Sequence, residues 1–309
     1  MSKRCQPSIL ATCCIPWNEG GSFAEEIFRR SVRKLLNELT RDIYLFGTAG
    51  EGYAVTDKQF DQIIRVFGEE MHPANARPML GIISLSLGTI LERIERARDQ
   101  GFRYFQISLP AWGALNDYEL MKFFEKVCGG FPDCSFLHYN LLRAKRLVTP
   151  DEYARLEGEF PNLVATKNSA ASFAWVTELM EKSPKLQHFF TEIPYGHGAL
   201  LGECGLLISV ASINFSLGRD YFEAGRKKDI NKLLPMQQEL KSLTSDLFSC
   251  TGGGAHMDGA YDKIFCKIRD PDFPLRLLPP YAGFSEAVFR DFVRLVREKH
   301  THWSIFKAS

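Results

Sequence analysis

Residues 44–56 read YLFGTAGEGYAVT, and this stretch changes character within a few residues. A short apolar run breaks into a segment with three glycines, a threonine and a glutamate, and a helical pattern follows. Glycine allows the backbone conformations that a tight turn requires. The stretch therefore predicts a buried strand that turns sharply into a helix. The turn could be a simple connection, or its backbone amides could hold an anion.

The same alternation of strand and helix continues along the chain. Amphipathic helical patterns, such as SFAEEIFRRSVRKLLNEL and TILERIERARDQG, separate short apolar runs, which is typical of parallel β/α units. Eight such runs predict a closed (β/α)8 barrel, the TIM-barrel class of α/β folds. An open doubly wound sheet is the alternative, but the Gly-x-Gly-x-x-Gly loop expected after its first strand is missing. The eight runs are SILATCCI, IYLFGT, PMLGII, FRYFQISLP, SFLHYN, LVATKN, HFFTE and LLISVAS.

The alternation stops after about Gly225. We therefore predict a barrel over residues 1–225 and a C-terminal extension of helices packed on the barrel over residues 226–309. Two helices are expected at DINKLLPMQQELKSLTSDLF and FSEAVFRDFVRLVREKH, with a third between them at AYDKIFCKI. The connection CTGGGAHMDG, at 250–259, is predicted to be flexible. No linker divides the chain into independent domains.

The composition argues against several classes of partner. The 309 residues include 38 Lys plus Arg and 37 Asp plus Glu, so the balance gives no electrostatic reason to expect nucleic acid or an anionic membrane. The eight cysteines form no C-x-x-C pair, so we expect free thiols in a reducing compartment and no zinc site. No run approaches the roughly 20 apolar residues of a membrane span. We therefore predict a cytoplasmic protein with no metal and no cofactor.

In such barrels the active site lies at the C-terminal ends of the strands, so the reactive residues that close a strand are the candidates. Lys167 closes NLVATKN, and strand alternation places Leu163, Ala165 and Lys167 on one face. A lysine at the end of an apolar strand is costly to desolvate, so its pKa is expected to fall. A neutral amine is what carbonyl attack and Schiff-base formation require. The alternative is a lysine that extends to the barrel rim.

Tyr139 closes the preceding strand, SFLHYN, and shares a face with Leu137, whereas His138 points the other way. Tyr139 and Lys167 should thus end adjacent strands on the same inner face. A phenol beside an amine can move the proton that imine formation transfers. Tyr139 could instead be a packed side chain with one hydrogen bond. At the end of the second strand, Thr48 adds a hydroxyl to the amides of GTAGEG, which would suit a carboxylate.

These three elements, in this order, resemble the dihydrodipicolinate synthase / N-acetylneuraminate lyase family. The family pattern has Gly-Thr/Ser-Thr-Gly-Glu after the second strand, Tyr-Asn after the fifth and Ile-Lys-Asp or similar after the sixth. The corresponding segments here are GTAGEG, HYN and ATKN, and the similarity continues into GECGLLISVASIN. The resemblance covers roughly the whole chain. It implies a (β/α)8 class I enzyme that makes or cleaves a C–C bond through a pyruvate Schiff base.

The resemblance also implies roles for single residues. Lys167 would form the imine with the 2-oxo group, Tyr139 would be the general acid and base, and Thr48 would relay protons to Tyr139. The backbone of Thr48 and Ala49 would hold the pyruvate carboxylate, and Ile208 would line the pyruvate site. Ala49 departs from the second threonine of the family loop, so one hydroxyl contact to the carboxylate is absent.

Further departures bear on the second substrate. The synthase pattern places an arginine shortly after Tyr-Asn, where it binds a carboxylate, and here Arg143 falls one position early. Thr191 and Glu192, after the seventh strand, are candidates for contacting the distal part of the substrate. The family often has a tyrosine after the fourth strand that reaches a neighbouring subunit, and Trp112 occupies that place. We expect Trp112 near a subunit contact.

The sequence therefore predicts a pyruvate-dependent aldolase, a carbon–carbon lyase that acts on a small keto acid and an aldehyde or sugar acid. Three alternatives remain open. A dehydratase would use the same lysine imine to remove water from a 2-keto-3-deoxy sugar acid, and dihydrodipicolinate synthase activity is the second. The third is a non-catalytic barrel that binds a keto acid. By resemblance the chain forms a homotetramer or homodimer.

Overall fold

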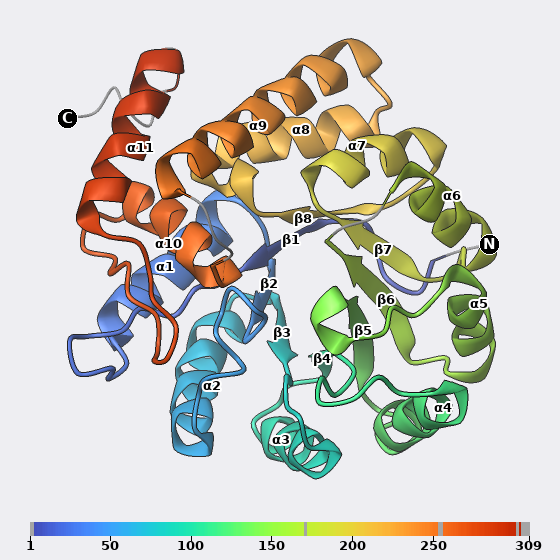
Figure 1. Ribbon diagram of the computed structural model, residues 1–309. Helices are drawn as coiled ribbons and strands as arrows, with labels where there is room; N and C mark the ends of the chain where they lie inside the picture. Colours follow the sequence, from blue (N-terminus) through green and yellow to red (C-terminus); the bar gives the residue numbers. More distant parts are fainter. Residues whose placement is uncertain (1–2, 170–171, 253–255, 301–302, 304–309) are drawn as a thin grey trace.

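The computed structural model describes residues 3–169, 172–252, 256–300 and 303. Eight parallel strands pair in chain order, and β8 pairs with β1, so the sheet closes into a barrel (Figure 1). The predicted (β/α)8 fold is confirmed. The strands are β1 (Ile9–Thr12), β2 (Asp42–Leu45), β3 (Arg77–Gly81), β4 (Tyr104–Ile107), β5 (Ser135–Asn140), β6 (Leu163–Asn168), β7 (Gln187–Phe190) and β8 (Gly205–Ile208).

A helix follows each strand and covers the outside of the barrel (Figure 1). The third helix buries the apolar face that its sequence spacing predicts, because Ile90, Ile94 and Ala97 are fully buried. The helices of this layer are α1 (Glu25–Glu38), α2 (Asp57–Met71), α3 (Leu87–Asp99), α4 (Asp117–Phe124), α5 (Pro150–Glu159), α6 (Phe173–Lys182), α7 (Glu192–Leu201) and α8 (Phe215–Arg226).

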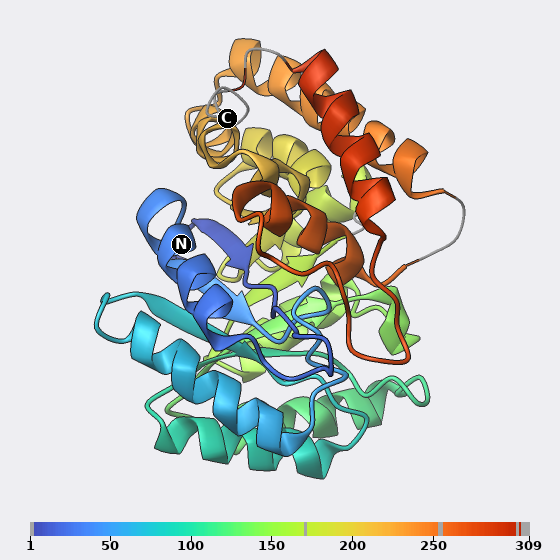
Figure 2. The same cartoon turned by 90° about the vertical axis from the view of Figure 1, so that its left-hand side faces the viewer.

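The chain then adds α9 (Ile230–Thr251), α10 (Asp258–Arg269) and α11 (Glu286–Lys299). These helices, orange to red in Figures 1 and 2, gather against one part of the barrel rather than spreading around it. Helix α9 packs on α7 and α8, and α11 packs on α9. Of the connection expected to be flexible, residues 253–255 lie outside the described residues. The boundary near residue 226 stays a prediction.

Most buried side chains of the described residues form two layers. Leu10, Tyr44, Leu137, Ala165, Phe189 and Leu207 fill the inside of the barrel, and a larger cluster lies between strands and helices. Leu163 belongs to the outer cluster, so its predicted place on the face of Ala165 and Lys167 is wrong. The physical reason is an irregularity in the β5–β6 pairing, where the register shifts between Phe136 and Leu137.

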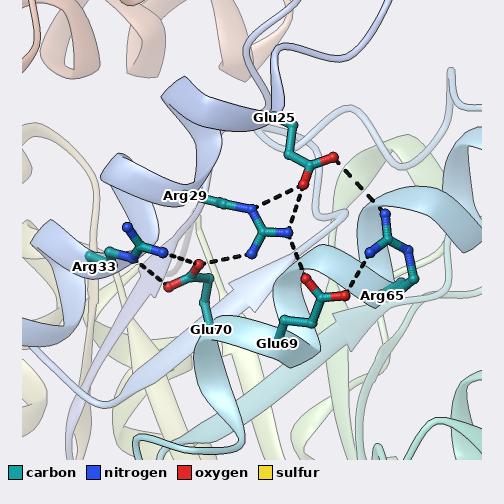
Figure 3. Close-up of polar contacts among 6 residues, drawn as sticks. All are labelled: Glu25, Arg29, Arg33, Arg65, Glu69 and Glu70. Carbon is teal, nitrogen blue, oxygen red and sulfur yellow. Dashed lines mark hydrogen bonds and ion pairs between the residues drawn. The ribbon is translucent and has the colours of Figure 1, made fainter.

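An ion-pair network joins α1 to α2 on the outer surface (Figure 3). Arg29 of α1 contacts Glu25 on its own helix and Glu69 and Glu70 on α2, at 2.5 to 2.9 Å. Arg65 of α2 contacts Glu69 in turn. Such networks fix the relative position of neighbouring helices, but exposed pairs are screened and add little to stability. The network lies outside the barrel and positions no candidate site residue directly.

Within the described part of the chain, none of the helices has the length and apolar character needed to cross a membrane. The same residues contain no group of three or more His, Cys, Asp and Glu side chains placed to hold a metal ion. All eight cysteines are free thiols.

Candidate active site

A cavity of about 760 Å³ opens at the C-terminal ends of the strands, where α9 and α10 border it. Its wall contains several of the predicted site residues and several that the sequence did not single out. The polar and charged lining residues are Thr12, Tyr44, Tyr139, Asn140, Arg143, Lys167, Asn168, Ser169, Ser172, Thr191, Ser209, Thr244, Asp258, Tyr261 and Asp262. The apolar lining residues include Ala49 and Ile208.

Lys167 lies at the centre of this arrangement and is 3% exposed. Its Nζ donates to the Tyr44 hydroxyl at 3.0 Å and, more weakly, to Gln106 Oε1 at 3.4 Å. Burial lowers the pKa of Lys167 to about 7, although the nearby carboxylates Asp258 and Asp262 raise it in part. A large fraction of Lys167 is therefore a neutral amine at neutral pH, as a nucleophile requires.

Tyr139 is the register partner of Lys167 on the neighbouring strand. The Lys167 nitrogen lies 3.8 Å from the centroid of the Tyr139 ring. Burial raises the pKa of Tyr139, and hydrogen bonding to Ser169 and Thr48 partly offsets this effect. The Lys167 amine and Thr48, the two groups predicted to act with Tyr139, thus both lie beside its phenol. His138 points outward, where Nδ1 lies 2.6 Å from the Tyr153 hydroxyl of α5.

The glycine-rich loop after β2 is packed so closely that its glycines leave no room for a side chain. A Cβ on Gly47 would lie 2.4 Å from the Tyr44 ring, and one on Gly50 would lie 2.8 Å from the Phe46 nitrogen. Within the described residues, the backbone amides of Thr48 and Ala49 make no hydrogen bond. Two such N–H groups beside a cavity are suited to a carboxylate.

Glu51 fixes this loop from behind and does not line the cavity. Its carboxylate accepts from Lys263 Nζ at 2.5 Å, from Trp17 Nε1 at 2.9 Å and from the Leu278 amide at 2.7 Å. The side chains of Glu51 and Lys263 are both 0% exposed. The carboxylate therefore joins the loop to α10 and to the segment that follows it.

Thr191 and Glu192, the two residues after β7 that were candidates for substrate contact, have different surroundings. Thr191 lines the cavity, as expected for a substrate contact. Glu192 does not: its Oε1 accepts from the backbone amides of Ser209 and Ala211, at 2.7 and 3.0 Å. The expected contact between Glu192 and substrate is therefore corrected. Because Glu192 is the first residue of α7 and buried, its carboxylate turns back to hold the loop after β8.

Arg143 lines the cavity, but it is paired there, because its guanidinium donates to Asp258 Oδ1 at 3.1 Å. Arg146, the next arginine along, contacts Asp117 at 2.7 Å and also Glu152, outside the cavity. Trp112 is 83% exposed on the loop after β4.

Four polar residues near Lys167 were missed from sequence: Tyr44, Gln106, Asp258 and Asp262. Alternation along the second and fourth strands could have placed Tyr44 and Gln106 inside the barrel. No comparable signal exists for the two aspartates, because sequence does not tell which extension helix borders the cavity.

Together these groups can bind a keto acid and form an imine. The amides of Thr48 and Ala49 can receive a carboxylate, Lys167 can attack a carbonyl carbon, and the Tyr139 phenol can move protons between them. Ile208 adds an apolar wall. Ala49, Tyr139 and Lys167 thus line one cavity, whereas Thr48 lines the adjoining cavity, which shares Leu141 and Arg143 with it.

The chain belongs to the dihydrodipicolinate synthetase family, whose model matches residues 6–254. A 4-hydroxy-tetrahydrodipicolinate synthase from Thermus thermophilus is 27% identical over 161 residues, covering 52% of this chain and 53% of that protein. The chain thus spans about half the length of the curated synthases it matches first. An N-acetylneuraminate lyase from Clostridium perfringens is 21% identical over 78% of this chain and 84% of that protein.

The fold has close counterparts among solved structures. The YagE protein of Escherichia coli, a prophage protein of the dihydrodipicolinic acid synthase family solved in complex with pyruvate, superposes with a TM-score of 0.83. The match covers 94% of this chain and 98% of that one, at 14% sequence identity. This likeness shows a shared barrel with its C-terminal helices.

Proposed function

We propose that this protein is a class I aldolase that makes or cleaves a C–C bond between pyruvate and an aldehyde, through an imine on Lys167. The observation that carries the proposal is the buried Lys167 amine, whose pKa falls to about 7 beside the Tyr139 phenol. Family membership supports the same reaction class. The amides of Thr48 and Ala49 are suited to the carboxylate of the keto acid.

In this reaction the neutral amine of Lys167 adds to the 2-oxo carbon of pyruvate. The resulting carbinolamine takes up a proton on its oxygen and loses water, which leaves a protonated imine. Loss of a proton from C3 gives an enamine, and C3 then attacks the aldehyde carbon while the aldehyde oxygen takes up a proton. Water hydrolyses the new imine and releases the product. Tyr139 moves these protons, and the reverse sequence cleaves the same bond.

Borohydride trapping tests the proposal. The protein is incubated with pyruvate, reduced, and its intact mass measured, and peptide mapping then locates the adduct. We expect one reduced pyruvyl group on Lys167 and none on Lys167→Ala. Lys182→Ala, which changes a surface lysine on α6, is the matched control and should retain the adduct. No adduct on folded wild-type protein would contradict the proposal.

The trap reports the imine that an aldolase, a dehydratase and dihydrodipicolinate synthase would share, so product identification is needed to separate them. Fresh protein that has not been reduced, incubated with 2-keto-3-deoxy sugar acids, should release pyruvate and an aldehyde. Release of a dehydrated keto acid without pyruvate would indicate the dehydratase instead. A non-catalytic barrel and a dedicated dihydrodipicolinate synthase would both form neither product from these acids, and only the synthase would trap pyruvate and then consume it with a second aldehyde.

We propose two further properties, a self-association and a location. The chain associates with copies of itself, and the loop that carries Trp112 forms part of that contact, because this large apolar side chain is 83% exposed. The cytoplasm is the proposed location, because eight free thiols suit a reducing compartment.

A further inference from the structure

Two carboxylates on α10 face the cavity that contains Lys167. Asp258 and Asp262 are one helical turn apart and both line the cavity wall. Asp262 is 7% exposed. Within the described residues, its carboxylate has one hydrogen bond, from the Ser209 hydroxyl at 3.5 Å, and no ion pair. A buried carboxylate with spare acceptor capacity thus lies in the proposed substrate site.

The cations of the cavity are already engaged. Among the described residues that line it, Lys167 and Arg143 are the two cationic side chains. Lys167 is the proposed imine-forming residue, and Arg143 donates to Asp258 at 3.1 Å. The charge of Arg143 is therefore compensated before any substrate binds.

In the described part of the cavity wall, the proposed complex then has no free cation for a second carboxylate. The keto acid brings a single negative charge, which the protonated imine on Lys167 offsets. A second carboxylate, on the aldehyde, would meet Asp262 and an arginine that is already paired. Bringing a charge into a partly buried site without a counter-charge is costly. Hydroxyl groups, in contrast, can donate hydrogen bonds to both aspartates.

We propose that Asp258 and Asp262 restrict the second substrate to an aldehyde that carries hydroxyl groups and no carboxylate, an inference that rests on the proposed aldolase function. Arg143 thus serves to hold Asp258 in place and is not the receptor for a substrate carboxylate. Burial also raises the pKa of Asp262 above its ordinary range, and the nearby Lys167 partly offsets this effect.

Three aldehydes with four carbons each test the specificity: erythrose with three hydroxyls, succinic semialdehyde with a carboxylate, and butanal with neither. For each, kcat/KM is measured for condensation with pyruvate, from the mass and amount of product. We expect the wild type to prefer erythrose to both others by at least about tenfold, the value of one hydrogen bond to a charged group.

Two variants probe the cause of the preference. Asp258→Asn releases Arg143 and should move the ratio of kcat/KM for succinic semialdehyde over erythrose upward by about tenfold, because a free cation becomes available. Asp262→Asn should move the ratio in the same direction. A general loss of activity cancels in the ratio. Asp270→Asn is the control: Asp270 follows α10 and pairs with Arg30 outside this cavity, so the ratio should not change.

Failure of the inference is distinguishable from failure of the proposed function. If wild-type protein traps pyruvate on Lys167 but uses succinic semialdehyde as well as erythrose, or uses none of the three aldehydes, the specificity assignment is overturned. It is also overturned if both Asp258→Asn and Asp262→Asn leave the ratio unchanged. If pyruvate is not trapped at all, the proposed function itself fails.

Discussion

Lys167 and Tyr139 are register partners on neighbouring strands, and the nitrogen of Lys167 lies 3.8 Å from the centroid of the Tyr139 ring. Strand pairing, and not a loop conformation, sets this relationship. Both side chains are buried, at 3% and 2% exposure, so neither is free to move away. A nucleophile and an acid–base group held on rigid strands keep their geometry through a reaction that involves several proton transfers.

The depressed pKa of Lys167 predicts the pH dependence of imine formation. Below about pH 7 the ammonium form dominates, and above it the neutral amine dominates, so the rate of adduct formation with pyruvate should rise with pH and level off above about 7. The measurement is the rate of adduct formation across pH 5 to 10, by reductive trapping followed by intact mass. A rate that continued to rise toward 10.5, the ordinary value for lysine, would contradict the effect of burial.

Two phenols flank Lys167, and their removal should have different effects. Tyr139→Phe removes the proposed acid–base group and should lower kcat by about 100-fold or more. Tyr44→Phe removes the hydroxyl that accepts from Lys167 Nζ at 3.0 Å, which favours the ammonium form. Its loss should lower the pKa of Lys167 further and move the pH midpoint of adduct formation downward, with a much smaller change in kcat above that midpoint.

Turnover and the pH profile of trapping, measured on both variants, separate these roles. If Tyr44→Phe reduced kcat as much as Tyr139→Phe at every pH, Tyr44 would share the acid–base role. If Tyr139→Phe retained full turnover, the proton path through Tyr139 would be wrong.

The buried pair of Glu51 and Lys263 should dominate local stability. Glu51→Gln leaves the Lys263 ammonium without a counter-charge, and loss of one partner of a buried pair costs about 3–5 kcal/mol of the free energy of unfolding. Chemical denaturation measures the loss. The double variant Glu51→Gln/Lys263→Met should lose less than the sum of the two single variants, since no charge is then stranded.

A surface glutamate provides the comparison for this pair. Glu69→Gln interrupts the network between α1 and α2 (Figure 3), where the Glu69 side chain is 44% exposed. Solvent and salt screen this interaction, so the change in unfolding free energy should be much smaller. Equal losses at Glu51 and Glu69 would show that burial of the ion pair has no special effect.

If the exposed Trp112 side chain forms part of the contact between copies, its replacement should weaken self-association. Trp112→Ser removes a large apolar side chain and should raise the dissociation constant between copies by at least about tenfold, as for an interface hot spot. Sedimentation or light scattering over a dilution series measures it. Ile230→Ser, at another exposed apolar position on α9, should have no such effect. A wild type that is monomeric at all concentrations would rule out the proposed contact.

The sequence was sufficient to predict the barrel because each strand and helix has its own pattern. An apolar run is longer than the strand in the structure wherever the backbone turns before the run ends. The run IYLFGT continues past β2, which ends at Leu45, because Phe46 takes a left-handed φ of 58° and its ring stacks on Phe60. The run LLISVAS likewise continues past β8, because Val210–Ile213 forms a short 3-10 helix.

Side-chain roles were predictable where strand alternation fixes direction. Alternation predicts the inward direction of the Lys167 and Tyr139 side chains, since both residues lie near the ends of strands whose last residues pair regularly. Glu192 does not, because the direction of its carboxylate depends on the turn into α7 and on amides from the loop after β8. Asp258 and Asp262 depend on how a helix from the end of the chain packs against the barrel. Such tertiary placement has no local pattern in sequence.

The contact between Glu51 and Lys263 joins positions 212 residues apart in the chain. During synthesis, the glycine-rich loop leaves the ribosome long before the lysine that neutralises its glutamate. A nascent chain that has completed all eight strands still lacks this lysine and both aspartates of α10. The cavity is therefore completed only after α10 has been synthesised, and a chain that stopped before α10 would carry a barrel without a finished binding site.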